Sequence, residues 1–259
     1  MGFERPIETI AARGVEIDVF LVPWDTEIFG FPVAQIERIA LKAGAEPGDG
    51  MRQLQAWMDH HRIRLASCRL DSRALRESML LEAHGFRFIE MVYSPVLAPI
   101  PDGGAADEEL SIDTAVDADL PVIEAIAGAA FDTGRYRLDW RIDPAAGDRR
   151  YRVWVRNSFS DQRQQVLKAT VAGEMVGFFI VEERPDRSAY WHLTAIAPAF
   201  QGQGVGKRLW RAMVGRHRQA GLVRIETTIS AHNPPVMNLY AALGFRFGAP
   251  RMTLHWVRD

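Results

Sequence analysis

A strand, a glycine-rich turn and a helix follow one another in the segment AIAPAFQGQGVGKRLW, residues 195–210. Three glycines spaced two apart separate an apolar stretch from a basic stretch whose apolar residues recur at helical spacing. Glycine permits backbone conformations that aim several N–H groups at one point, and the N-terminus of a helix adds positive potential there. The segment therefore predicts a turn that holds an anion such as a pyrophosphate.

The spacing of this turn excludes two common phosphate loops. A Walker loop needs glycine where this chain has Gln201, and Ser or Thr where it has Arg208. A dinucleotide fingerprint needs a third glycine where Lys207 stands. The remaining pattern is Gln201, two residues, Gly204, one residue and Gly206. Lys207 and Arg208 oppose the helix dipole unless an anion lies beside them; the alternative is that both are solvated surface side chains.

The composition is that of an ordinary globular protein, with 259 residues of which 47% are hydrophobic and 25% charged. A formal net charge of -2 gives no global basic field, so we expect no nucleic-acid partner and no attraction to a membrane surface. The single cysteine, Cys68, excludes an intrachain disulfide. No apolar run approaches the ~20 residues of a membrane span, and the start MGFERPIETI lacks the pattern of a signal peptide. We expect a cytoplasmic protein.

The segment APIPDGGAADEE, residues 98–109, is rich in Pro, Gly and acidic residues and is interpreted as a linker. It separates an N-terminal α/β lobe, residues 1–97, from a C-terminal domain, residues 110–259. In the lobe, hydrophobic periodicity predicts strands at 15–22, 32–41, 63–70 and 86–97, helices at 51–61 and 72–84, and a turn-rich segment at 23–31. In the domain it predicts strands at 110–115, 164–171, 174–183, 188–197, 222–230 and 245–257, and helices at 117–130, 145–159, 204–220 and 234–243. Runs of strands with helices on their faces imply an α+β fold.

A short internal similarity links the two parts. Sliding the chain by 159 residues superposes LLEAHGFRF on LYAALGFRF, so that Gly85 falls on Gly244. Helix-glycine-strand junctions are often alike, because glycine suits the position after a helix, so the similarity leaves open whether the two parts are related halves. Leu81 stands where the second copy has Tyr240, and the first copy has no glycine loop.

The segment SAHNPPVMNLYAALGF, residues 230–245, predicts a capped helix. Asn233 is a favourable N-cap residue, Pro234 is favourable at the first helical position, and Gly244 ends the helix. This local structure alone accounts for Tyr240 as a buried aromatic residue.

Taken together, LTAIAPAFQGQGVGKRL and the later Asn and Leu-Tyr of NPPVMNLYAALGF resemble the motifs of the GNAT superfamily of N-acyltransferases. The resemblance implies a mixed, mostly antiparallel sheet flanked by helices, joined to a smaller, degenerate GNAT-like N-terminal lobe. It implies acetyl-CoA as co-substrate, with the pyrophosphate held by backbone N–H groups and the pantetheine arm paired along the strand before the turn as an added strand. The cofactor-binding residues would be Thr194, Ala195, Ile196, Gln201, Gln203, Gly204, Val205, Gly206, Lys207 and Asn233.

The resemblance also implies a chemistry. Tyr240 would lie near the thioester sulfur, and a phenol can donate a proton to a leaving thiolate as general acid. His192, which alternation places on one strand face with Tyr190 and Thr194, is the candidate base, directly or through water. The acidic residue that the family carries at this strand is absent, so the base stays open. A backbone N–H near Ile196 would stabilise the oxyanion, and no metal is implied.

The N-terminal stretch LVPWDTEIFGFPVAQIE and the segment FDTGRYRLDWRID resemble the two-lobed GNAT proteins typified by TDP-fucosamine acetyltransferase. That resemblance implies a small-molecule amine acceptor, with a nucleotide-linked amino sugar preferred, and Phe131, Arg135, Tyr136 and Asp139 on the acceptor side. The alternatives are an amino acid, a peptide N-terminus or an antibiotic as acceptor, or a sensor domain that binds acyl-CoA without turnover. A homodimer is left open.

Overall fold

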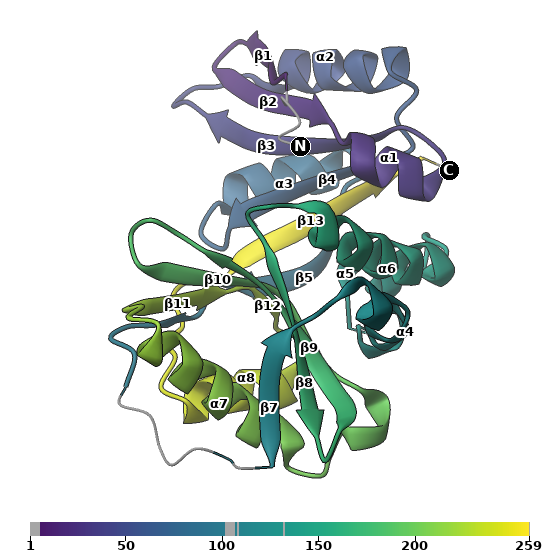
Figure 1. Ribbon diagram of the computed structural model, residues 1–259. Helices are drawn as coiled ribbons and strands as arrows, with labels where there is room; N and C mark the ends of the chain where they lie inside the picture. Colours follow the sequence, from purple (N-terminus) through teal and green to yellow (C-terminus); the bar gives the residue numbers. More distant parts are fainter. Residues whose placement is uncertain (1–5, 102–106, 108, 132, 259) are drawn as a thin grey trace. The chain divides into compact units, whose positions relative to one another are not determined.

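The computed structural model describes residues 6–101, 107, 109–131 and 133–258, which form two compact units (Figure 1). The first unit groups residues 1–92 with 135–146 and 249–259, and the second groups residues 93–134 with 147–248. The units are therefore not the two contiguous segments expected from the sequence, because two later segments return to the first unit. Half of the expected linker at 98–109, namely residues 102–106 and 108, lies outside the described residues, as do residues 1–5.

The first unit is built around a sheet whose strands run in the order β1-β2-β3-β4-β13-β5. Neighbouring strands are antiparallel except β3 and β4, which are parallel. Its elements are β1 (Glu8–Ala12), β2 (Val15–Leu21), α1 (Pro23–Phe29), β3 (Val33–Leu41), α2 (Pro47–His60), β4 (Leu65–Asp71), α3 (Leu75–Ala83), β5 (Arg87–Tyr93), α5 (Arg135–Leu138) and β13 (Arg251–Val257).

The core of the first unit follows from simple periodicity. Strand β2 alternates buried and half-buried residues, and its buried Val15, Ile17 and Val19 pack in one cluster with α2. Met51 and Leu54 of α2 lie on its buried stripe, three residues apart.

Two expectations for the first unit are wrong. The segment predicted as turns, residues 23–31, forms helix α1, since Pro23 opens it and Gly30 ends it with a φ of 72°. The predicted final strand at 245–257 begins only at Arg251 and is inserted between β4 and β5. Pairing with strands about 170 residues earlier in the chain leaves no local signal, so periodicity alone could not show it.

The second unit contains a sheet of order β6-β11-β10-β9-β8-β7, in which β10 and β11 are the parallel pair. Its elements are β6 (Val96–Leu97), β7 (Leu110–Thr114), α4 (Leu120–Ala130), α6 (Pro144–Ser160), β8 (Gln165–Val171), β9 (Glu174–Glu183), β10 (Ser188–Ile196), α7 (Val205–Gln219), β11 (Arg224–Thr227), β12 (Ile229–Ser230) and α8 (Pro234–Ala242), with 3-10 turns at Asp117–Asp119 and Pro198–Phe200. The single strand predicted at 222–230 is thus two short strands.

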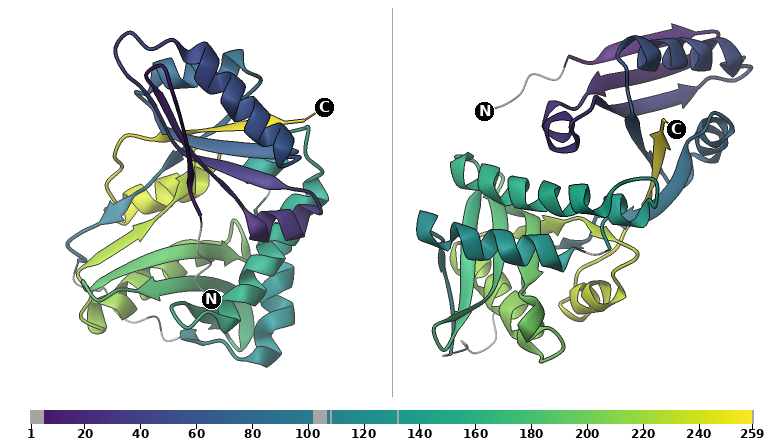
Figure 2. Two further views of the ribbon diagram at one scale, coloured as in Figure 1. Left: turned by 90° about the horizontal axis from the view of Figure 1, so that it is seen from above. Right: turned by 90° about the vertical axis from the view of Figure 1, so that its right-hand side faces the viewer.

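Helices cover both faces of this second sheet (Figure 2). Phe179 and Trp191 face one cluster, which includes residues of α7 and α8, whereas Phe178 and Ile180 face another, which includes residues of α4 and α6. Because successive strand residues point to opposite faces, a strand covered on both sides reads as the continuous apolar run VGFFIV.

The same local structure, a helix that ends at a glycine with positive φ, occurs once in each unit. After α3, Gly85 has a φ of 90° and Phe86 N–H donates to the Leu81 carbonyl at 3.1 Å. After α8, Gly244 has a φ of 89° and the corresponding N–H donates to the Tyr240 carbonyl at 3.0 Å. Leu81 and Tyr240 are both buried, so each junction anchors one large side chain in the core of its own unit.

Candidate cofactor and catalytic site

Strand β10 separates from β11 halfway along its length. The two strands pair from Ser188 to Trp191, and the pairing ends where Trp191 faces Thr227. The Thr227 hydroxyl donates to the Trp191 carbonyl at 3.0 Å, which occupies this acceptor with a side chain. On its other side β10 stays paired with β9 as far as Ile196. The strand thus has the splayed edge that the sequence predicted for an added strand.

On the paired side of β10, Gly177 of β9 allows the two strands to approach closely where β10 ends. A Cβ atom at this position would lie 2.5 Å from the Ala195 carbonyl oxygen. Any side chain would therefore push the two strands apart just before the glycine turn.

The glycine turn joins the end of β10 to α7 as predicted. Gly202 and Gly204 have φ values of 74° and 78°, which side-chain-bearing residues rarely adopt, and Gly204 is the N-cap of α7. No side chain in the described part of the chain caps the helix, so its first N–H groups stay available there. The Gln201 amide donates to the Ile196 carbonyl at 3.2 Å and the Gln203 amide to the Ala199 carbonyl at 2.6 Å, which ties the turn back on itself.

The two cations at this helix start have different environments. Arg208 donates to both carboxylate oxygens of Asp107, at 2.6 and 2.8 Å, and also pairs with Glu109. These hydrogen bonds raise the pKa of Arg208 above its usual value. Arg208 therefore has its counter-charges within the chain, which is neither of the two alternatives that the sequence left open for it. Lys207 is exposed and has no ion pair with the described residues, so it remains a candidate phosphate contact.

The start of α8 has the predicted cap. The Asn233 side-chain oxygen accepts a hydrogen bond from the Val236 N–H at 3.3 Å, and Pro234 opens the helix. Asn233 is half-buried, and its side-chain NH2 group makes no hydrogen bond within the described part of the chain. The amide therefore both closes the helix and keeps two donors free.

Tyr240 lies in the core beneath β10, with 2% of its surface exposed. Its ring centroid is 4.8 Å from that of Phe245 and 6.3 Å from that of Trp191. Burial raises the pKa of the Tyr240 hydroxyl, and polar groups of Trp210, Thr227 and Thr194 act in the opposite direction. The hydroxyl is therefore protonated at neutral pH, and it lies among residues of the strand that leads to the glycine turn.

His192 stands at a bulge of β10, between the residues paired with Val181 and Ile180. Its Nε2 lies 2.9 Å from a carboxylate oxygen of Glu182 on the neighbouring strand, and its ring is 4.8 Å from that of Tyr190. Burial lowers the pKa of His192, while the hydrogen bond and the charge of Glu182 raise it. Sequence reasoning missed Glu182, although the antiparallel hairpin places it opposite Tyr190, two residues from His192.

The four residues expected on the acceptor side are divided between the units. Arg135, Tyr136 and Asp139 belong to the first unit, while Phe131 belongs to the second, where it stacks on Tyr151 at 4.4 Å between centroids. The Tyr136 hydroxyl donates to Asp25 at 3.0 Å, and Arg135 lies over the Tyr136 ring at 4.5 Å. The structure thus shows Tyr136 engaged inside the first unit.

Asp139 belongs to a buried group of charged and polar side chains in the first unit. It accepts two hydrogen bonds from Arg141, both at 2.8 Å, and lies 3.0 Å from Nδ1 of His255. Burial acts to raise the pKa of Asp139, but these hydrogen bonds outweigh it and hold the pKa well below its usual value. Asp139 is therefore an anchor for Arg141 and His255.

Two kinds of feature are absent from the residues that the structure describes. No group of three or more His, Cys, Asp or Glu side chains there is arranged to hold a metal ion. No helix there is long and apolar enough to cross a membrane.

The chain is similar to known acetyltransferases. Residues 133–245 match the Acetyltransferase (GNAT) family. An L-2,4-diaminobutyric acid acetyltransferase from Nocardia farcinica is 31% identical over 125 residues, which cover 47% of this chain and 62% of that relative. The chain therefore spans less than two thirds of the length of that relative.

Solved structures support the fold over nearly the whole chain. A GCN5-related N-acetyltransferase from Sphaerobacter thermophilus matches with a TM-score of 0.66 at 14% identity, covering 94% of this chain and 76% of that one. A tandem GNAT protein from the clavulanic acid biosynthesis pathway matches with a TM-score of 0.56 at 15% identity, covering 96% and 85%. The expected fold, mixed and mostly antiparallel sheets flanked by helices in the GNAT arrangement, is confirmed.

Proposed function

We propose that this protein transfers the acetyl group of acetyl-CoA to a primary amine of a small molecule. The observation that carries the proposal is the edge of β10 beyond Trp191, which pairs with no strand among the described residues and leads through the glycine turn to the start of α7. An extended amide-bearing arm fits an open strand edge, and a pyrophosphate fits the N–H groups from Gln203 to Lys207. Thr194, Ala195 and Ile196 line that edge, and the free donors of Asn233 are available to the same ligand.

The chemistry needs a proton acceptor for the attacking amine and a proton donor for the departing sulfur. A neutral amine nitrogen attacks the thioester carbonyl carbon, the C–S bond breaks, and the sulfur takes up a proton. We assign the first role to His192, oriented by Glu182, and the second to Tyr240. The raised pKa of Tyr240 means that the hydroxyl still carries its proton when the thiolate forms.

The first unit is proposed to have no acyl-CoA site. Its helix α2 corresponds to α7, because each helix connects a parallel strand pair, β3 with β4 and β10 with β11. At the start of α2, however, stand Glu46 and Asp49, and Asp49 pairs with Arg13 at 2.6 Å. Carboxylates at a helix N-terminus satisfy the dipole and repel a pyrophosphate. Leu81 also replaces the tyrosine.

For the acceptor we propose a small diamino acid, because the relative from Nocardia farcinica is an L-2,4-diaminobutyric acid acetyltransferase. The nucleotide-linked amino sugar suggested by the two-lobed resemblance is the competing acceptor. Both acceptors carry a primary amine that can attack the thioester. They differ in the rest of the molecule, which is an amino acid in one case and a nucleotide-linked sugar in the other.

The test combines binding and turnover on the full chain. Calorimetry with coenzyme A should show one site, and release of free thiol from acetyl-CoA should depend on an added amine. The panel contains L-2,4-diaminobutyrate, a nucleotide-linked 4-amino sugar, a polyamine and a single-amine amino acid. Binding of coenzyme A with no thiol release beyond hydrolysis for any amine would favour the sensor function, and no binding at all would refute the cofactor site.

A further inference from the structure

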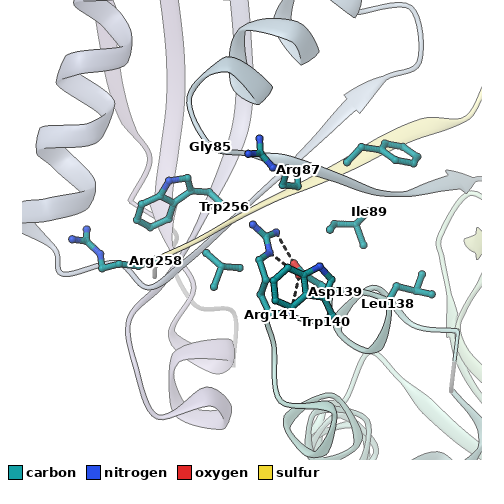
Figure 3. A pocket seen from close by; sticks show the side chains of 11 residues that line it. Gly85, Arg87, Ile89, Leu138, Asp139, Trp140, Arg141, Trp256 and Arg258 are labelled. Carbon is teal, nitrogen blue, oxygen red and sulfur yellow. Dashed lines mark hydrogen bonds and ion pairs between the residues drawn. The ribbon is translucent and has the colours of Figure 1, made fainter.

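The first unit contains a cavity that the proposed reaction does not use. Its volume is about 720 Å³, within the range of sites that hold small molecules. The lining comes from the α3–β5 junction, the segment after α5 and the end of β13 (Figure 3). The lining residues that carry the argument are Arg87, Asp139, Trp140, Arg141, Trp256 and Arg258.

Two indole rings face this cavity in different ways. Trp140 is 89% exposed, so nearly its whole apolar surface faces water. Trp256 is half-buried and packs against Gly85, where a Cβ atom would lie 3.2 Å from the indole. An exposed indole on the wall of a cavity is unfavourable in water and favourable against a flat ligand.

Three arginines, Arg87, Arg141 and Arg258, line the same cavity. Arg141 is fixed by its two hydrogen bonds to Asp139 and by a third to the His255 carbonyl at 3.2 Å. Arg258 lies over the Trp256 ring at 5.2 Å and pairs with Asp59. Asp139 and Asp59 thus each neutralise one arginine.

Arg87 is the arginine without a counter-charge. It donates to two backbone carbonyls, those of Glu82 at 3.2 Å and Phe86 at 3.1 Å, and has no acidic partner within the described ranges. These two bonds hold the guanidinium at the cavity in Figure 3 while its charge stays uncompensated. The cavity as a whole therefore favours an anion.

We propose that this cavity binds a small molecule in which a flat ring carries an anionic group, a phosphate or a carboxylate. The ring stacks on Trp140 and the anion pairs with Arg87, with Trp256 and Arg141 as fixed walls. The proposal rests on contacts within the first unit and not on acetyl transfer.

The test is calorimetric titration of the full chain, without acetyl-CoA, with four probes. Uridine supplies a ring alone, inorganic phosphate an anion alone, and uridine monophosphate and benzoate supply both. The expected result is that at least one of the last two binds at least tenfold more tightly than either uridine or phosphate. Which of them binds decides between phosphate and carboxylate. Equal binding of phosphate and the best combined probe would mean an adventitious ion only, and would overturn the proposal, as would no binding.

Variants locate the response. Trp140→Ala and Arg87→Gln should each weaken the best probe at least fivefold, and the exposure of Trp140 makes the first change safe for folding. The matched controls are Met79→Ala, which removes another exposed apolar side chain, and Arg76→Gln, which removes another exposed arginine of the same unit. Unchanged affinity in both test variants, or an equal loss in the controls, would contradict the site.

Discussion

The imidazole Nε2 of His192 lies 2.9 Å from a carboxylate oxygen of Glu182, across the β9–β10 hairpin. The carboxylate fixes the ring and, by accepting from Nε2, leaves Nδ1 as the nitrogen that can take a proton. Both side chains are half-buried, so the pair is neither fully solvated nor sealed in the core. This is the arrangement expected of a base whose orientation is set by a second residue.

Replacing Glu182 by Gln should change both rate and pH dependence. Burial already lowers the pKa of His192, and the carboxylate opposes that shift, so its removal lowers the pKa further. A weaker base should reduce kcat on the order of tenfold, and the acid limb of the rate profile should move to lower pH. Steady-state rates across pH 5 to 9 measure both effects.

The neighbouring Glu183→Gln serves as the control for this change. Its side chain is more exposed and lies 3.7 Å from His217 rather than near His192. If Glu182→Gln kept the rate and the acid limb of the unchanged protein, Glu182 would have no positioning role.

The features of the site that follow local rules were predictable from sequence. The Asn233 cap, the ends of α8 and the glycine turn all depend on residues within a few positions of one another. Glu182 was not found, because its role depends on strand register across a hairpin that contains a bulge. The place of β13 was missed for the same reason, since its partners lie in the first unit's sheet. The ion pair of Arg208 could not be foreseen, because its partner Asp107 is about 100 residues away in the chain.

The Gly204→Ala variant tests the glycine turn. A side chain at a φ of 78° costs on the order of 1–2 kcal/mol, and relief of that strain would turn the first N–H groups of α7 away from the ligand. We expect the Kd for coenzyme A to rise by on the order of tenfold, measured by calorimetry.

Gly215→Ala is the matched control on the same helix. Nothing lies within 4 Å of a Cβ atom there, and its backbone is not in the left-handed region. Alanine within a helix should stabilise the protein by roughly 0.5–1 kcal/mol and leave coenzyme A binding unchanged. Equal affinity of both variants would show that the turn does not position the ligand.

Two buried histidines predict loss of stability in mild acid. Burial lowers the pKa of both His217 and His255 to about 4, whereas an imidazole in the unfolded chain titrates near pH 6.5. Between these values the unfolded chain binds more protons, so stability falls as the pH drops from about 6.5 to about 4. The full effect is about 3 kcal/mol for each imidazole.

The His217→Gln variant should lose part of this dependence. Trp191 donates to His217 Nε2 at 2.9 Å, and a glutamine oxygen can replace that acceptor without titrating. Thermal unfolding from pH 7 to pH 4 should therefore show a flatter decline in Tm for this variant than for the unchanged chain. The exposed His84→Gln should decline as steeply as the unchanged chain. A decline identical to that of the unchanged chain would mean that His217 is protonated as easily in the folded chain as in the unfolded chain, and so adds nothing to the pH dependence of stability.

The last prediction separates a catalytic from a structural Tyr240. Tyr240→Phe keeps the ring packed against Phe245 and removes the hydroxyl, so it should lower kcat on the order of ten- to a hundredfold and leave the Kd for coenzyme A unchanged. Tyr190→Phe is the control, because Tyr190 is a half-buried residue of β10 whose hydroxyl is hydrogen-bonded to that of Thr228 at 2.6 Å. If the hydroxyl were purely structural, its removal would instead lower the free energy of unfolding by about 1 kcal/mol, through the lost hydrogen bond, and lower Tm with it. The kcat would then be retained. That outcome would leave the departing thiolate without its proposed proton donor.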